Sequence, residues 1–168
     1  MKALSNHVIR DHVIIGGIAA WLATPILGTS GSLAFWVATV MVDIDHYFNF
    51  LWRAKFRVFG ISPMFRYHEQ LFEKRHRPEF LAIEVFHTIE FIFLFGWTAL
   101  YFKGPLLGAF WGIVFHMLVD FVHLGRYGIL TKRSISFVEY YWRRAKMKAG
   151  GKNPALPFQE AMREAGIL

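Results

Sequence analysis

Four long apolar stretches dominate this sequence of 168 residues. A bilayer-spanning helix needs about 20 mostly apolar residues, and the stretches at about 7–27, 32–52, 80–102 and 105–124 approach or reach that length. A helix in a soluble core keeps a polar face, whereas the third and fourth stretches show almost none. The sequence therefore predicts an all-α, polytopic membrane protein, with four transmembrane helices bundled in a single domain.

The connections and the positive charges predict the topology of this bundle. The turns after the first and third stretches are short, which favours antiparallel hairpins. Of the 19 Lys and Arg residues, all but Lys103 lie before or at the start of the first stretch, in the loop 53–79 or in the tail 126–168. By the positive-inside rule, we expect a multi-pass protein of the inner (cytoplasmic) membrane with both termini, the loop and the tail in the cytoplasm.

The loop and the tail interleave basic and aromatic residues, as at 56–75 and 137–148. Basic amphipathic helices of this kind lie on anionic lipid head groups, so membrane lipid is an expected partner. The alternative is an ordinary solvated face beside a membrane span. Nucleic acid is not an expected partner because no nucleic-acid-binding fold signature is present. The sequence leaves open a homo-oligomer or a larger membrane complex.

Ionisable residues inside the apolar stretches are the second unusual feature. Such groups are costly in a membrane and usually mark function. The chain has eight His and no Cys, which excludes disulfides and thiolate ligands. The first stretch begins near His7, Asp11 and His12, and the later stretches carry Asp43, Asp45, His46, Glu84, His87, Glu90, His116, Asp120 and His123.

Their depth and helical phase indicate one site. In the predicted topology, all of them fall in the cytoplasmic half of the bundle. His116 and Asp120 are four residues apart and His123 follows three later, so the three share a helix face. Imidazoles and carboxylates that project inward from several helices are how helix bundles hold metal ions. A single His at an apolar position is more often a hydrogen-bonded core residue, but separate core residues would not share both depth and phase.

The run Val42-Asp43-Ile44-Asp45-His46 resembles the Asp-x-Asp-His signature of the membrane-bound metal-dependent hydrolase family, the LexA-binding-like inner-membrane proteins. His116-Met-Leu-Val-Asp120 is similar to the His-x-x-x-Asp helix of that family, and His12 or His7 to its first His. The middle motif differs: Pro78 follows His76-Arg77, and we match the ligand-like His to His87. The resemblance implies hydrolysis, of a phosphoester, by one or more divalent metals.

Specific roles follow from combining the residues with this resemblance. The expected ion is zinc, with manganese or iron as alternatives, and one or two ions are open. Asp43 and Glu84 are candidates for the general base or for partners of the ligands. Arg53, Arg77 and Arg126 are candidates for binding an anionic head group. The expected metal ligands are His12, Asp45, His46, His87, His116 and Asp120.

Other function classes remain open at this point. Polar residues can join helices in a non-catalytic subunit of a larger complex. His87 and His116 could be axial ligands of a haem, although that role needs no carboxylates, and a di-iron protein is a closer alternative. The sequence assigns no role to His7, His76 or His123. It contains no phosphate-binding Gly-rich loop.

Overall fold

The computed structural model describes the backbone of residues 3–168 and the side chains from Arg10 onward. The described residues are helical, and their one extended pairing is an isolated bridge between Ala82 and Arg133. This confirms the all-α prediction. The chain divides into two compact units, residues 1–43 with 85–128 (unit 1) and residues 44–84 with 129–168 (unit 2). The side chain of His7 lies outside the described residues.

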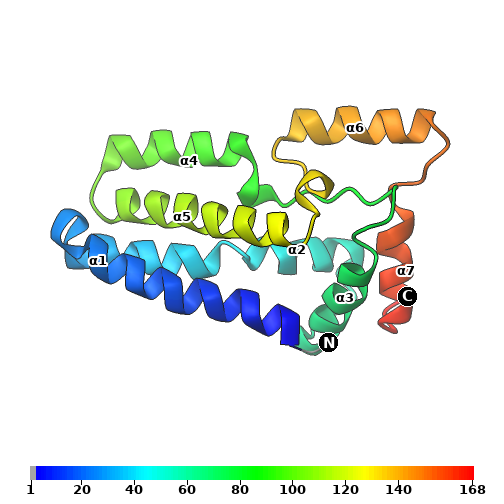
Figure 1. Cartoon of the computed structure of the whole chain (residues 1–168), viewed down its shortest axis with the longest axis horizontal. Coiled ribbons are helices and arrows are strands. Elements are labelled where there is room, and N and C mark those ends of the chain that lie inside the picture. The colour runs from blue at the N-terminus through cyan, green and yellow to red at the C-terminus, as the bar shows by residue number, and fades with distance from the viewer. Residues whose placement is uncertain (1–2) are drawn as a thin grey trace. The chain divides into compact units, whose positions relative to one another are not determined.

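Unit 1 begins with α1 (Ala3–Met41), which turns back on itself at Gly28 (Figure 1). Gly28 has φ 67° and ψ 171°, a conformation that a residue without a Cβ adopts readily. The Trp36 indole N–H donates to the Val13 carbonyl at 3.0 Å, which ties the second limb of α1 to the first. The predicted hairpin is therefore present, with its turn at Gly28.

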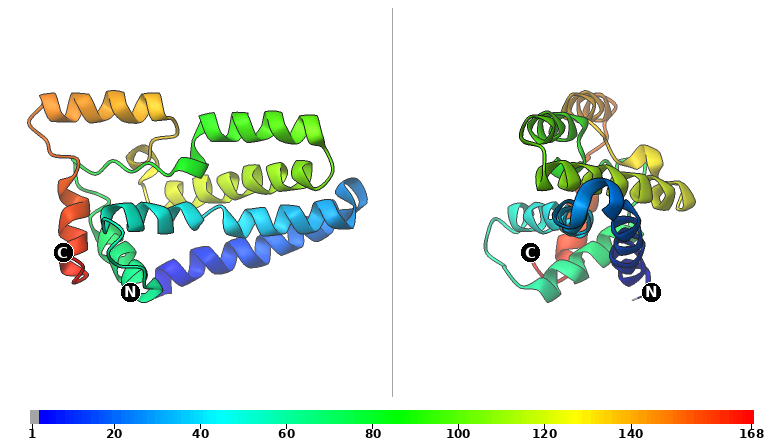
Figure 2. Two further views of the ribbon diagram at one scale, coloured as in Figure 1. Left: turned by 180° about the vertical axis from the view of Figure 1, so that it is seen from behind. Right: turned by 90° about the vertical axis from the view of Figure 1, so that its left-hand side faces the viewer.

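The second limb of α1 packs closely on α5 (Pro105–Arg126). A Cβ added to Gly108 would lie 2.0 Å from the Gly31 carbonyl oxygen, and one added to Gly112 would lie 2.2 Å from that of Phe35. Only glycine permits this backbone approach. On its other side α5 contacts α4 (Ile89–Phe102), which runs beside it (Figure 2). Pro105 opens α5, as predicted for a helix start.

The predicted helix at 80–102 is wrong in its first part. A short 3₁₀ turn, η1 (Val85–His87), precedes α4, which starts at Ile89 and has 14 residues. In unit 2, residues before η1 are extended because the Ala82 N–H donates to the Lys132 carbonyl and the Ser134 N–H donates to the Ala82 carbonyl, both at 2.9 Å. These pairings satisfy backbone groups that a helix would otherwise use.

Two helical segments, Arg10–Arg53 and Pro105–Arg126, are long and apolar enough to cross a membrane, judged by length and composition. The first contains both limbs of α1, and α4 is apolar but shorter. Large apolar side chains such as Trp21, Ile26 and Trp97 are mostly exposed, which suits a lipid environment. Four spans, the inner membrane and the orientation of the termini stay predictions.

Unit 2 holds the predicted basic loop and tail, and both form helices. Its elements are α2 (Ile44–Arg53), α3 (Ile61–Glu73), the turn η2 (Leu130–Lys132), α6 (Phe137–Ala149) and α7 (Leu156–Glu164). Its core is built on Phe50, Tyr67 and Met162, which bring α2, α3 and α7 together. Lys74 Nζ, itself buried, donates to Glu164 Oε2 at 2.6 Å and joins the end of α3 to α7.

Candidate metal centre

His116 is the centre of a buried His and Asp cluster within unit 1. It lies on α5, and its side chain is fully buried. Its Nδ1 lies 2.7 Å from the Thr39 carbonyl oxygen of α1. A carbonyl oxygen only accepts hydrogen bonds, so Nδ1 carries the proton. In the neutral form of this imidazole, the single lone pair lies on Nε2 and points away from that bond.

Three further donor atoms surround His116 Nε2. His87 Nε2 lies 3.0 Å away, Asp43 Oδ1 3.4 Å and Asp120 Oδ2 3.6 Å. His87 Nε2 in turn lies 3.5 Å from Asp43 Oδ1 and 3.6 Å from Asp120 Oδ2. Each carboxylate oxygen thus lies within 3.6 Å of both imidazole nitrogens, and the four residues come from the end of α1, from η1 and from α5.

The local sequence explains how His87 reaches this point. Thr88 follows it and caps α4: its Oγ1 accepts from the Phe91 N–H at 3.3 Å and donates to the Val85 carbonyl at 2.8 Å. These two hydrogen bonds of Thr88 close the 3₁₀ turn and start the helix at the next residue. His87, the last residue of the turn, is consequently held inward with its side chain fully buried.

Asp43 is the exposed edge of the cluster. It follows directly after α1, whose last turn is closed by the Val42 N–H donating to the Ala38 carbonyl at 3.1 Å. The Asp43 side chain is 27% exposed, whereas those of His87 and His116 are 0% and that of Asp120 is 12% exposed. A small molecule would therefore approach the cluster from the side of Asp43.

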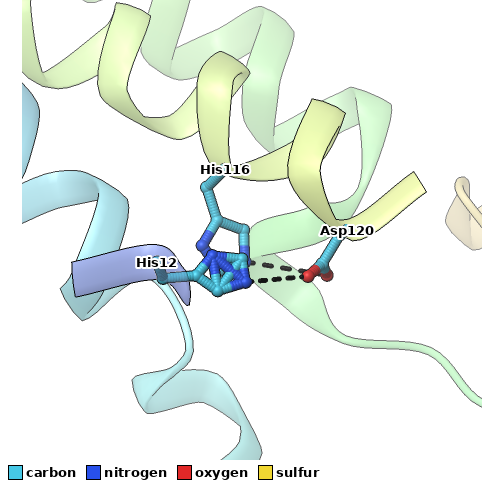
Figure 3. A group of neighbouring side chains, drawn as sticks. All are labelled: His12, His116 and Asp120. Atoms are coloured by element: carbon cyan, nitrogen blue, oxygen red, sulfur yellow. Dashed lines mark ion pairs between the residues drawn. The ribbon is translucent and has the colours of Figure 1, made fainter. Parts of the chain in front are cut away.

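His12 adds a third imidazole on the other oxygen of Asp120. His12 Nε2 lies 3.2 Å from Asp120 Oδ1, and the His12 ring stacks on that of His116 with centroids 3.9 Å apart (Figure 3). The His12 side chain is 1% exposed, and neither ring nitrogen has a hydrogen bond with good geometry to any described residue. A buried imidazole in this state costs free energy unless an ion or a shared proton satisfies it.

This arrangement can hold a divalent metal ion. Metal–ligand bonds of about 2.0–2.2 Å place the ligand atoms of a tetrahedral site about 3.3–3.6 Å apart, and the three distances among Asp43 Oδ1, His87 Nε2 and His116 Nε2 run from 3.0 to 3.5 Å. Within unit 1, two donor groups fit the distances of a shared ion, Asp43–His87–His116 and His12–His116–Asp120. Both use His116, which offers one lone pair, so a single ion can use it at a time.

The remaining predicted ligands lie in unit 2, where they contact one another. His46 Nδ1 is 2.9 Å from Asp45 Oδ1 and 3.6 Å from Glu84 Oε2, and Asn49 Nδ2 donates to Glu84 Oε2 at 3.1 Å. The His46 ring also stacks on His68, with centroids 5.6 Å apart. The part of Asp45 and His46 in metal binding, and of Glu84 in catalysis, stays a prediction.

The surroundings of His68 and Glu84 in unit 2 shift the pKa values of both groups. Burial, helped by the neighbouring His46, lowers the pKa of His68 to about 4, so His68 is neutral at neutral pH. Burial alone would raise the pKa of Glu84, but the charge and hydrogen bond of His46 outweigh it and hold that pKa below its usual value. Glu84 is therefore ionised at neutral pH.

The predicted head-group residues have different surroundings. In unit 2, Arg53 Nε donates to Asn49 Oδ1 at 2.6 Å and its guanidinium lies 3.7 Å from the Phe158 ring centroid, while Arg77 pairs with Glu160. In unit 1, Arg126 is the exposed last residue of α5. Substrate binding by these three residues stays a prediction.

Of the histidines without an assigned role, His76 and His123 belong to neither donor group, although the His123 ring lies 6.2 Å from that of His12. His123 Nε2 is 3.6 Å from Asp11 Oδ2, and the exposed His76 lies after α3 in unit 2.

Two residues that contribute to the site were not found by sequence reasoning, Thr39 and Thr88. Thr88 left a signal, because Thr followed by an apolar run with an acidic residue is typical of an N-cap. Thr39 left no signal in the sequence, because the group that positions His116 is its backbone carbonyl, which every residue has.

Thr39 also bonds across the helix interface, and this gives a first prediction. Its Oγ1 lies 2.9 Å from the Phe35 carbonyl oxygen and 3.0 Å from that of Gly112, one turn before His116. We expect Thr39→Val to lower the free energy of unfolding by about 1 kcal/mol, since it removes a buried hydrogen bond. Thermal unfolding in detergent measures the loss. Thr98→Val is the control, because Thr98 bonds within α4 alone; an equal loss in both variants would contradict the interhelical role.

No family model, curated protein or solved structure matches this chain. The functional argument therefore rests on the buried cluster: three imidazoles and two carboxylates from two helices, a helix end and a 3₁₀ turn, placed so that a metal ion can bind.

Proposed function

We propose that this protein is a membrane-embedded, metal-dependent hydrolase that cleaves a phosphoester at the cytoplasmic face of the membrane. The observation that carries the proposal is the donor group Asp43 Oδ1, His87 Nε2 and His116 Nε2, whose atoms lie 3.0–3.5 Å apart and would leave a tetrahedral ion one position for water. Intramembrane ionisable residues mark function, and the resemblance of the Asp-x-Asp-His run to a hydrolase family points to the same reaction class.

The donor set favours one zinc ion. Zinc binds imidazole nitrogen and carboxylate oxygen in tetrahedral sites, and the chain has no thiolate to offer. The carboxylates of Asp43 and Asp120 would balance the charge of a divalent cation in a buried place. His116 fixes the count at one ion for this cluster, because its other nitrogen is bonded to the Thr39 carbonyl. A haem is disfavoured, since its axial ligands lie on opposite faces of a macrocycle and His87 and His116 are in direct contact.

The chain's own residues would divide the work as follows. The ion supplies a Lewis acid and acidifies water. Asp43, predicted as a base or a ligand partner, would be a ligand of the ion at the exposed edge of the cluster, and we expect the substrate to enter there. Asp120 Oδ2 lies 3.6 Å from both His87 Nε2 and His116 Nε2, while Oδ1 faces His12. The pair of Asp120 and His12 is then positioned to accept a proton from water and pass it to the leaving oxygen.

The substrate class follows from charge and location. A phosphoester is anionic, and the cytoplasmic side of the predicted topology carries nearly all Lys and Arg residues. A lipid-like or membrane-associated substrate fits a site at the ends of apolar helices.

Reconstitution with metal tests this function. Protein stripped by a chelator and reloaded with zinc or manganese should hydrolyse chromogenic or lipid phosphoesters in detergent, and Asp120→Asn should lower the rate at least about 100-fold, as loss of a general base does. Asp11→Asn is the matched control, because Asp11 lies on α1 and faces His123 instead of the donor atoms. Metal-loaded protein that leaves phosphate monoesters and diesters intact would contradict the proposal.

A scaffold without a metal is the second candidate, and one observation favours it. His87 Nε2 and His116 Nε2 are 3.0 Å apart, which is also a hydrogen-bond distance. In that case the cluster only joins α1, α5 and the turn before α4. Purified protein that keeps its fold and binds no divalent ion would support the scaffold and overturn the hydrolase.

A further inference from the structure

The helix α6 in unit 2 presents an apolar stripe that no part of its own unit covers. Val138, Tyr141 and Trp142 are 76%, 66% and 63% exposed, and Ala145 and Ala149 on the same face are exposed as well. None of its residues is buried. At 100° per residue these positions form one band along the helix. Soluble domains rarely leave Trp and Tyr together on such a band, so the stripe indicates an interaction surface.

Two lysines border this stripe. The same helical spacing puts Lys146 on one side of the band and Lys148 on the other, and both are exposed. Lys146 Nζ lies 5.4 Å from the Trp142 ring. No described carboxylate forms an ion pair with either lysine. The cations thus stand beside the apolar band, available to a negatively charged surface.

The other charges of α6 are used within unit 2. Arg143 donates to Glu139 Oε1 at 2.8 Å and to the Thr131 carbonyl, and Arg144 donates to the Tyr140 hydroxyl at 2.8 Å. The bond from Arg143 to Thr131 ties this opposite side of the helix to η2, and the other two bonds lie within α6. One side of α6 is therefore bonded to the rest of unit 2. The other side is an exposed amphipathic face that combines aromatic rings with lysines.

We propose that α6 lies in the interface of an anionic lipid layer, with Val138, Tyr141 and Trp142 at the level of the head groups and Lys146 and Lys148 on lipid phosphates. This inference rests on the membrane placement proposed above. Tyr and Trp prefer the membrane interface, and lysines near the surface bind anionic lipid. Ten residues join α5 to α6, so the helix starts within about 40 Å of the end of α5.

The absence of cysteine allows a site-specific test on the whole protein. Single variants Ala145→Cys on the stripe, Leu118→Cys on α5 and Gln159→Cys on α7 carry an environment-sensitive fluorophore, and all three positions are exposed. The labelled proteins are placed in nanodiscs of zwitterionic lipid alone or with phosphatidylglycerol. Acrylamide quenching then reports how well water reaches each label.

We expect the Ala145 label to be protected from acrylamide in anionic discs, with blue-shifted emission. Its quenching by acrylamide should rise at least about fivefold in zwitterionic discs, and likewise when Lys146→Glu and Lys148→Glu are added. The Leu118 label should be protected in both discs, and the Gln159 label in neither. An Ala145 label as accessible as Gln159 in anionic discs, with Leu118 protected, would overturn the docking of α6 and leave the membrane placement standing. An accessible Leu118 label would overturn both. Protection of Ala145 that depends only on protein concentration would assign the stripe to a second copy of the chain.

Discussion

His116→Gln is expected to abolish metal binding. Loss of a residue that only positions a ligand lowers metal affinity by about 10–100-fold, so loss of the central ligand should exceed about 100-fold. Gln keeps most of the side-chain volume, and its amide can still donate to the Thr39 carbonyl that now accepts from Nδ1. Calorimetric titration of zinc into the metal-free protein measures the affinity, and elemental analysis gives the bound ions per chain.

His76→Gln is the matched control for this variant. His76 is exposed and lies in unit 2, outside the cluster. The His76→Gln variant should bind one ion per chain with unchanged affinity. Both variants should keep the helical circular dichroism of the original protein. Wild-type affinity in the folded His116→Gln variant would show that the ion, if bound, lies elsewhere.

Gly112→Ala is expected to disrupt both the helix packing and the site. The added Cβ would fall 2.2 Å from the Phe35 carbonyl oxygen, a backbone atom that cannot rotate away. The second limb of α1 and α5 must then separate, which costs about 1–3 kcal/mol or more. Separation also lengthens the bond from His116 Nδ1 to Thr39 and the bond from Thr39 Oγ1 to Gly112. We therefore expect a lower melting temperature together with weaker zinc binding.

Gly125→Ala provides the control on the same helix. Nothing lies within 4 Å of a Cβ at Gly125, and alanine stabilises a helix relative to glycine by about 1 kcal/mol. Thermal unfolding in detergent should show no loss of stability for this variant. Similar losses for Gly112→Ala and Gly125→Ala would mean that the close approach of the two backbones is unimportant.

The parts of the fold that depend on local signals were predictable. The apolar run ending near Gly28 gave the hairpin in α1, and Pro105 gave the start of α5. The segment at 80–84 was not predictable, because it is extended by pairing with the chain near Arg133, about fifty residues later. A periodicity argument cannot detect a partner at that distance in the sequence. The break after Met41 was also missed, since apolar residues continue on both sides of it.

The candidate site was predictable in composition and less so in detail. Helical spacing placed His116 and Asp120 together, and the common depth brought in His12 and His87. From the sequence, Asp45 was the predicted ligand of the Asp-x-Asp-His run and Asp43 a base or a ligand partner. In unit 1 it is Asp43 that lies beside His87 and His116, because the chain turns after α1, a turn that sequence spacing does not reveal.

Cobalt substitution tests the central claim most directly. Cobalt(II) in a four-coordinate N and O site gives strong visible absorption, whereas a six-coordinate ion absorbs weakly. We predict that titration of the metal-free protein gives strong bands that saturate at one equivalent and that are lost in His116→Gln, because Asp43, His87 and His116 offer three ligand atoms and water would complete a four-coordinate site. Weak bands, or strong bands that persist in His116→Gln, would contradict a metal centre built on His116.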